Sequence, residues 1–294
     1  MSEHKVFFSN NHKIVWGESL SYLREMISES VDLVFADPPY NIGKDFDGYG
    51  DSVAEAEYFA WSYQWIDEVI RILKPNGTFY LMNSTQNIPA LDLFCREKLQ
   101  IVSRIVWSYD SSGVQAKKYF GSMYEPILHM VKDPKKYTFN SKEILVEAKT
   151  GAKRGLIDYR KNPPQPYNTT KVPGNVWEFP RVRFLMEEYE NHPSQKPEAL
   201  MERIIKASSN PDDTILDPFA GSFTTGAIAK KLNRKSISIE QNETYVKIGL
   251  RRIGIESNYS ETELEKVKIR KTTNHSKYVR PEGLVEQAVL KLEL

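Results

Sequence analysis

Short apolar runs rich in β-branched residues alternate along the chain with longer segments whose apolar residues recur at helical spacing. The run 31–36 is typical of a buried strand, and the segment 54–73 is typical of a helix that stops before Pro75 and Gly77. Taken together, the patterns predict an α/β protein. They also predict strands at 13–16, 78–82, 101–107, 125–131, 213–216 and 236–239, and helices at 20–27, 90–99, 198–208, 224–232 and 242–252.

Between residues 108 and 191 this periodicity breaks down, apart from the strand expected at 125–131. Five prolines between 163 and 180 and many interleaved basic and aromatic residues replace it, which predicts a mostly irregular, partly β insertion. We therefore expect a domain in two halves with an insertion and an extension. The four parts are a first half at 1–108, the insertion at 109–191, a second half at 192–256 and a basic C-terminal extension at 257–294.

Composition narrows the class of protein. A chain of 294 residues, 40% apolar and 27% charged, can bury a substantial core. It has no apolar run of membrane length and no secretory signal at its N-terminus, so we expect a cytoplasmic protein without a membrane partner. The single cysteine, Cys95, excludes an internal disulfide and a Cys-rich zinc site, and we expect it to be inert packing on a helix.

The net charge of the chain does not indicate its partners, but the basic residues are unevenly distributed along it. The net charge of +1 says nothing about nucleic acid. Residues 149–183, however, hold eight basic and two acidic residues, and residues 266–280 hold six basic residues and no acid. Basic residues interleaved with aromatic ones suit phosphate contact combined with stacking. The alternative for either run is a solvated face, and for the insertion a surface excursion that packs its rings on the domain.

Asp37, Pro38, Pro39 and Tyr40 follow the predicted strand 31–36 at its C-terminal end, where an open parallel sheet binds ligands. An exocyclic amine on a flat base is a poor nucleophile because its lone pair is conjugated with the ring. The Asp37 carboxylate and the Pro38 carbonyl can accept its hydrogens and localise that pair, while the prolines restrict the backbone and Tyr40 offers a stacking face. This set predicts amine activation; the alternative is an aspartate that caps a turn beside a packing tyrosine.

A second set of residues follows the strand predicted at 213–216. A turn with Asp217 and Gly221, a helix, a strand and then Glu240 occur in order, which is the layout of a nucleoside-binding βαβ unit. Its few glycines and the absence of a P-loop disfavour a pyrophosphate, and Asp217 favours a ligand with a positive group. Joined with the amine-activating set, this predicts methyl transfer from S-adenosylmethionine. Turn or helix capping is the alternative for either acid.

At these residues the sequence resembles the β class of amino-group DNA methyltransferases, in which the catalytic tetrad precedes the target-recognition region and the cofactor motif comes last. The resemblance covers nearly the whole chain. Residues 107–125, 162–167 and 172–180 are similar to YhdJ-type orphan adenine methyltransferases, whose target is the palindrome ATGCAT. The resemblance implies a Rossmann-like methyltransferase sheet with a circularly permuted strand order. It also implies that residues 109–191 are the target-recognition insertion.

The resemblance also implies roles for individual residues. Asp37 would bind the target amine, Pro38 would supply a carbonyl, and Tyr40 would stack on an adenine flipped out of duplex DNA. Phe223 stands where many relatives have a second glycine, so the turn would approach the cofactor less closely there. Asp217, Phe219, Ala220, Gly221, Ser222 and Glu240 would hold the cofactor, Lys196, Ser194 and Gln195 would lie at its amino-acid end, and Glu18 would meet its adenine.

For DNA contact we expect basic residues of the insertion, and we expect no metal. The basic set is Lys117, Lys118, Arg154, Arg160, Lys161, Arg181 and Arg183. Three alternatives stay open: cytosine in place of adenine, RNA or a protein amide in place of DNA, and a DNA-binding regulator that has lost catalysis. His192 has no second His or Cys nearby in sequence, so we expect it to be structural. A palindromic target favours a homodimer.

Overall fold

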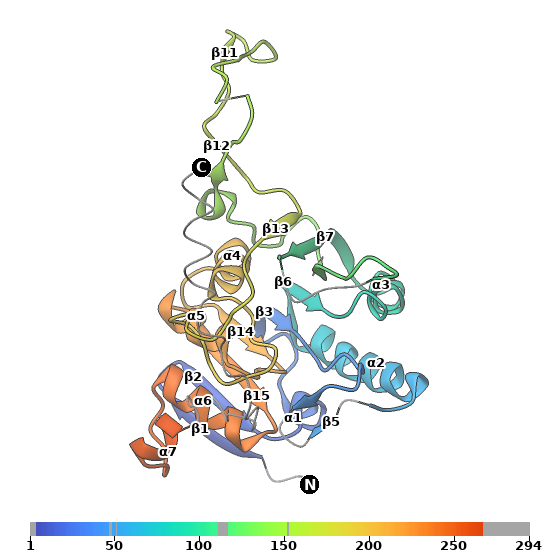
Figure 1. The fold of residues 1–294 in the computed structure, drawn as a ribbon, viewed down its shortest axis with the longest axis vertical. Helices are drawn as coiled ribbons and strands as arrows, with labels where there is room; N and C mark the ends of the chain where they lie inside the picture. The colour runs from blue at the N-terminus through green and yellow to red at the C-terminus, as the bar shows by residue number, and fades with distance from the viewer. Residues whose placement is uncertain (1–3, 47–48, 51, 111–116, 152, 267–294) are drawn as a thin grey trace, which may run out of the picture.

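Nine strands form one mixed sheet in the part of the chain that the computed structural model describes, residues 4–46, 49–50, 52–110, 117–151 and 153–266 (Figure 1). The second to the sixth strand in the sheet order given next run parallel to one another, and the first, at the edge, is antiparallel to its neighbour. In sheet order the strands are β1 (Lys5–Ser9), β2 (His12–Trp16), β15 (Lys235–Glu240), β14 (Thr214–Asp217), β3 (Val31–Ala36), β6 (Leu73–Met82), β8 (Tyr124–Val131), β7 (Gln100–Ser108) and β13 (Val176–Glu178).

The two central strands come from opposite ends of the sequence. β3 pairs in parallel with β14, with Val34 opposite Leu216, so the first and second halves share one sheet. Leu33 and Val34 are fully buried on opposite faces, which explains why residues 33–36 form a continuous apolar run rather than an alternating one. β8 is antiparallel to both β6 and β7.

Helices cover both faces of the sheet (Figure 1). One layer packs its apolar stripe on Val34 and Phe79, as Trp65 and Val69 of its longest helix illustrate. The other layer packs residues such as Ile204 on the opposite face. The first layer contains α1 (Ser19–Glu25), α2 (Glu55–Ile72) and α3 (Ile88–Cys95); the second contains α4 (Glu198–Ser208), α5 (Thr224–Lys231) and α6 (Glu243–Ile253). No helix in the described ranges has the length and apolar character needed to cross a bilayer.

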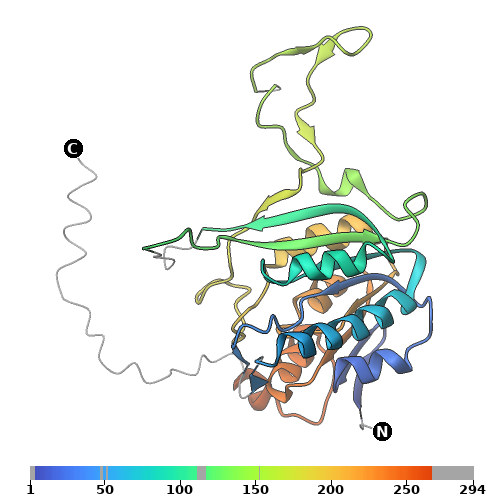
Figure 2. The ribbon, with the colours of Figure 1, turned by 90° about the vertical axis from the view of Figure 1, so that its right-hand side faces the viewer.

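The chain between β8 and β13 forms an arm that stands away from the sheet (Figure 2). Its strands form two short antiparallel pairs, so little apolar surface is buried there. The 3₁₀ turn η1 (Ser141–Ile144) packs on α4 at the base of the arm. The arm itself contains β9 (Val146–Glu147) paired with β12 (Thr170–Lys171), and β10 (Ile157–Asp158) paired with β11 (Gln165–Pro166). Outside the arm, β4 (Asp45–Phe46) pairs with β5 (Tyr49–Gly50), and α7 (Glu261–Lys266) follows α6.

The α/β prediction is confirmed, and the differences are local. β1 was not predicted, and β6 starts at Leu73 instead of 78, because the chain becomes extended directly after α2. β8 and β13 lie inside the predicted insertion yet belong to the main sheet, so the irregular part is 132–175. Cys95 is fully buried on α3, and burial raises the pKa of its thiol to about 12. The basic stretch beyond 266 lies outside the described residues.

Candidate active site

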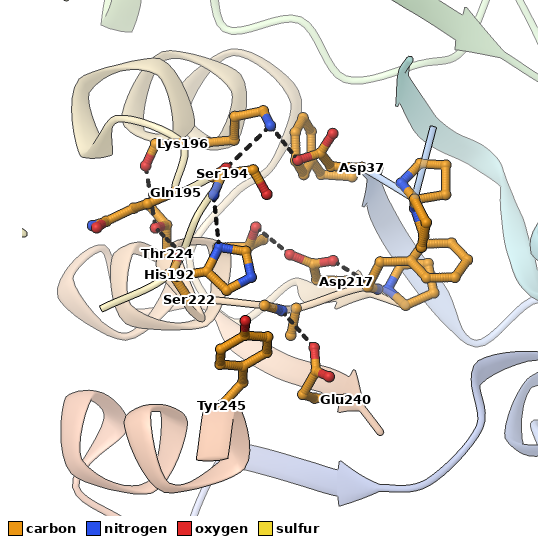
Figure 3. Close-up of a pocket in the computed structure, with 18 of the residues that line it drawn as sticks. Asp37, His192, Ser194, Gln195, Lys196, Asp217, Ser222, Thr224, Glu240 and Tyr245 are labelled. Carbon is orange, nitrogen blue, oxygen red and sulfur yellow. Dashed lines mark hydrogen bonds and ion pairs between the residues drawn. The ribbon is translucent and has the colours of Figure 1, made fainter. Parts of the chain in front are cut away.

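A cavity of about 370 Å³ opens at the C-terminal ends of β3 and β14. From β3 the chain continues through α2 to β6, and from β14 it continues through α5 to β15 on the other side, so the cavity lies where the strand order reverses. Ligands bind at this point in open α/β sheets. Asp37 and Asp217 both line it, so the two predicted sets of residues share one cavity (Figure 3).

Asp37 is the centre of a side-chain network. The Tyr40 hydroxyl lies 2.5 Å from Oδ1 of Asp37, and the Lys196 ammonium lies 2.6 Å from Oδ2. The Asp37 side chain is 15% exposed and that of Lys196 only 8%. Burial raises the pKa of Asp37 by more than the Lys196 charge lowers it. The pKa of Lys196 is raised as well: burial alone would lower it, but the charges and hydrogen bonds of Asp37 and Glu125 together outweigh burial.

The loop that carries Asp37 is held by its backbone carbonyls. The Tyr58 hydroxyl on α2 donates to the Pro39 carbonyl at 2.8 Å, and the Asn87 amide donates to the Tyr40 carbonyl at 2.6 Å. Asn83 in turn donates to the Tyr58 hydroxyl. Among the described residues no hydrogen bond to the Pro38 carbonyl is seen, and Pro38 lines the cavity together with Asp37.

Asp217 is almost completely buried at the end of β14. Its Oδ2 accepts a hydrogen bond from the Thr225 hydroxyl at 2.6 Å, and its Oδ1 accepts one from the Phe219 amide at 3.0 Å. Burial raises its pKa to about 7, and these two bonds offset only part of that effect. Asp217 therefore gains or loses its proton near neutral pH.

Glu240 ends β15 and faces the same cavity (Figure 3). Its Oε2 accepts from the Gly221 amide at 2.9 Å and its Oε1 from the Asn242 amide at 2.8 Å, so backbone donors fix the carboxylate. Gly221 has a φ of +49°, and a Cβ there would lie 2.8 Å from Nε2 of His192. Only glycine fits this turn, which lets a ligand approach the backbone.

Phe223 resolves the departure noted in the sequence. It takes a φ of +59° as the residue before α5, a conformation that glycine usually supplies. Its ring is fully buried, does not line the cavity and packs against Gly249 of α6, where an added Cβ would lie 2.5 Å from it. The turn keeps its shape with a bulky side chain because the ring points away from the ligand space.

The segment that begins at His192 joins the two sets. Gln195 is fixed by the Glu190 amide, which donates to its Oε1 at 2.7 Å. The Ser194 amide donates to Nδ1 of His192, whose ring packs on Tyr245, and burial lowers the His192 pKa to about 3. His192 is thus neutral and packed, as expected of a structural residue. Lys196, predicted at the amino-acid end of a cofactor, places its ammonium on Asp37.

The comparisons with known proteins agree with this geometry. A family model for N6/N4 methyltransferases, described as DNA methylase, matches residues 31–251. The chain belongs to this DNA methylase family. It is 64% identical over 274 residues to "DNA adenine methyltransferase YhdJ" of Escherichia coli, covering 93% of each chain. It is 34% identical over 250 residues to "Type II methyltransferase M.HpaI" of Haemophilus parainfluenzae, covering 84% of this chain and 76% of the relative.

Solved structures of methylases share the fold. The PvuII DNA methyltransferase (cytosine-N4-specific) superposes with a TM-score of 0.66 at 20% identity, covering 88% of this chain and 92% of that one. The M1.HpyAVI-SAM complex superposes with a TM-score of 0.58 at 24% identity, covering 82% of this chain and 98% of that one. These likenesses confirm the methyltransferase fold.

The methylase site also contains a residue that the sequence did not reveal. Glu125, the second residue of β8, places Oε2 3.0 Å from the Tyr40 hydroxyl and 3.5 Å from the Lys196 ammonium. Burial alone would raise its pKa, but Lys196 and the Tyr40 hydroxyl outweigh burial and lower it. The only sign of Glu125 in the sequence is an acid at the start of a mostly apolar strand. Strands that end at the protein surface often begin with an acid too, so this pattern does not identify a functional residue.

The remaining predicted residues lie in different places. Glu18 lines the cavity, but its carboxylate caps α1 by accepting from the Leu20 and Ser21 amides. Of the basic set, only Arg181 lines the cavity, with its guanidinium 5.1 Å from the Tyr109 ring centre. The others lie outside the cavity lining: Lys117, Lys118 and Arg154 are exposed, Arg160 pairs with Asp158, Lys161 donates to Asn168, and Arg183 donates to the Asp110 carbonyl.

Proposed function

We propose that this methylase transfers a methyl group from S-adenosylmethionine to the N6 amine of an adenine flipped out of duplex DNA. One observation carries the proposal: Asp37 and Pro38 line the same cavity as Asp217 and Glu240. The adenine specificity of the 64% identical relative supports the choice of base. A carboxylate and a carbonyl side by side suit the two hydrogens of an amine.

The residues present fit S-adenosylmethionine. Glu240 is fixed by backbone amides and can accept bonds from ribose hydroxyls. Gly221 allows close approach to the backbone, and Trp61 and Phe219 supply apolar lining for an adenine ring. Asp217 is negative above pH 7 and suits a positively charged ligand. When bound, the cofactor supplies an electrophilic methyl group bonded to a sulfonium.

The chain's own residues would orient the substrate amine. Asp37 and the Pro38 carbonyl accept its hydrogens and turn its lone pair towards the cofactor side of the cavity. The Tyr40 ring lines the same cavity and would offer a stacking surface for the base. The Asp37 carboxylate is largely buried, so its hydrogen bonds are stronger than they would be in water.

The duplex would contact the basic insertion. Lys117 and Lys118 lie beside the exposed rings of Tyr119 and Phe120, a combination suited to phosphate contact and base stacking. Arg181 lines the cavity, where it would contact a phosphate of the flipped nucleotide. The arm carries Arg154, Arg160 and Lys161 away from the sheet, so it can follow a groove that the body does not reach (Figure 2).

The target ATGCAT, a homodimer and a cytoplasmic location are further parts of this proposal. The target and the dimer rest on the resemblance of the insertion to the YhdJ type, since a palindrome presents the same site to two related subunits. The location follows from the substrate, chromosomal DNA.

Expression in a host without DNA methylation tests the proposal, with an Asp37→Ala variant as control. Sequencing should find N6-methyladenine in one sequence with the wild type, and ATGCAT is the expected site. Asp37→Ala should lower the methylation rate in vitro by about 1,000-fold or more while leaving the cofactor dissociation constant within about 3-fold. Methylated cytosine, methylation of RNA alone, or DNA binding without any methylation would each refute the proposed activity.

A further inference from the structure

The catalytic aspartate already has two hydrogen-bond donors in the absence of substrate. Tyr40 donates to one oxygen of Asp37, and Lys196 donates to the other. Both donors must leave room if the amine of a base is to bind the same carboxylate. Glu125 lies within reach of both, at 3.0 Å from the Tyr40 hydroxyl and 3.5 Å from the Lys196 ammonium.

The Tyr40 hydroxyl has one hydrogen and two carboxylate acceptors. Its pKa is raised well above the usual value by burial and by the charges of Asp37 and Glu125, so it stays neutral and acts as a donor. If the hydrogen turns to Glu125, Oδ1 of Asp37 becomes available to a substrate. Without Glu125 the hydroxyl has no second carboxylate to turn to, and it competes with the amine.

Charge balance gives Glu125 a second effect. Two carboxylates, Asp37 and Glu125, contact one ammonium, that of Lys196, so the contacting groups carry an excess negative charge. In the proposed reaction the amine nitrogen bonds to the methyl carbon as the carbon–sulfur bond breaks and the sulfur keeps the electron pair. The nitrogen is then cationic until it loses a proton to water, and an excess negative charge favours that state.

We propose that Glu125 is a positioning residue for catalysis, which draws Tyr40 and Lys196 off Asp37 and keeps the amine pocket anionic. This inference rests on the proposed function. Glu125 lines the cavity and is proposed to act through its neighbours, so its loss should reduce turnover far more than binding.

The proposal predicts a specific change in pH dependence. The groups that face Glu125 are Asp37, Tyr40, Tyr109 and Lys196, with Arg181 and Lys44 farther away. The Glu125 charge raises the pKa of Asp37, so its removal should shift the acid limb of turnover to lower pH. It also raises the pKa of Lys196, which should fall in the same variant. These shifts report the charge coupling between Glu125 and its neighbours, and the single-turnover rate reports whether that coupling matters for catalysis.

The test compares wild type, Glu125→Gln and Glu125→Asp, with Glu97→Gln as a matched exposed control at the end of α3. Glu125→Gln should lower single-turnover methylation by about 10- to 100-fold, with the dissociation constants for cofactor and DNA within about 3-fold. Glu125→Asp should recover part of the rate, because it restores the charge. Glu97→Gln should match the wild type. In the free proteins, ¹³C titration of the Asp37 carboxyl should show a lower pKa in Glu125→Gln.

Each other outcome overturns the inference. A Glu125→Gln enzyme with wild-type turnover would do so, and so would a slower one whose Asp37 pKa is unchanged. A folded Glu125→Asp variant no faster than Glu125→Gln would show that the charge is irrelevant. If the wild type does not methylate DNA, the proposed function fails first, and the Asp37 titration in the free protein still separates the two claims.

Discussion

The two acidic pairs that meet in the cavity are built differently. Asp217 and Glu240 accept hydrogen bonds mainly from backbone amides within their own βαβ unit. Asp37 and Glu125 instead share the side chains of Tyr40 and Lys196, and these four residues come from three separate segments. A cofactor half whose shape is set by the backbone is already formed before any ligand binds. A catalytic half held by side chains can rearrange when a base enters.

Among three changes that test this difference, the largest effect should come from changing the backbone of the cofactor half. Gly221→Ala adds a Cβ that overlaps the His192 ring at a φ of +49°, so the turn must shift. We expect the S-adenosylmethionine dissociation constant to rise by about 100-fold, measured by calorimetry. The matched control is Gly155→Ala, which has a φ of +62° but no atom within 4 Å of the added Cβ. Wild-type cofactor affinity in Gly221→Ala would mean that this half is not rigid.

A medium effect should appear in the pH dependence of stability. Burial raises the pKa of Asp217 to about 7, so the folded state binds its proton more tightly than the unfolded state does. The stability that this proton supplies is complete below the unfolded pKa near 4 and is lost as pH rises to about 7. Asp217→Asn removes the titration. Its Tm should therefore gain about 5 °C relative to wild type between pH 4 and pH 8 in thermal melts. A constant Tm difference across this range would contradict the raised pKa.

The smallest effect should come from the support of the catalytic loop. Tyr58→Phe removes the hydroxyl that donates to the Pro39 carbonyl and leaves the ring in place. The loop then keeps its Asn87 bond, so we expect kcat to fall by only about 3- to 10-fold with unchanged cofactor affinity. Tyr63→Phe on the same helix is the control, because that ring stacks on Phe94 away from the cavity. A loss comparable to that of Asp37→Ala would mean that the loop depends on Tyr58 alone.

The difference between the two halves also explains what the sequence could reveal. Asp217, Gly221 and Glu240 lie within one βαβ unit, so their order along the chain was enough to predict a nucleoside site. Asp37 was predictable because it ends a continuous apolar strand. Glu125 was not, because it lies 85 residues from Tyr40 and only the antiparallel insertion of β8 brings the two together.

Strand pairing limited the fold prediction in the same way. Periodicity located most helices and strands, because burial on one or both faces leaves a local pattern. It did not show that β8 and β13 belong to the main sheet, since sheet order depends on contacts between distant segments. Nor could it show the direction of the Phe223 ring, which depends on the space that Gly249 leaves on α6.

The pairing of β3 with β14 has a consequence during synthesis on the ribosome. Asp32 at the start of β3 accepts a hydrogen bond from the Thr214 amide, 182 residues later. A nascent chain shorter than this exposes one edge of its most apolar strand, with no partner yet translated. Truncated chains ending before β14 should therefore depend on chaperones and aggregate, while the full chain closes its sheet only as translation nears its end.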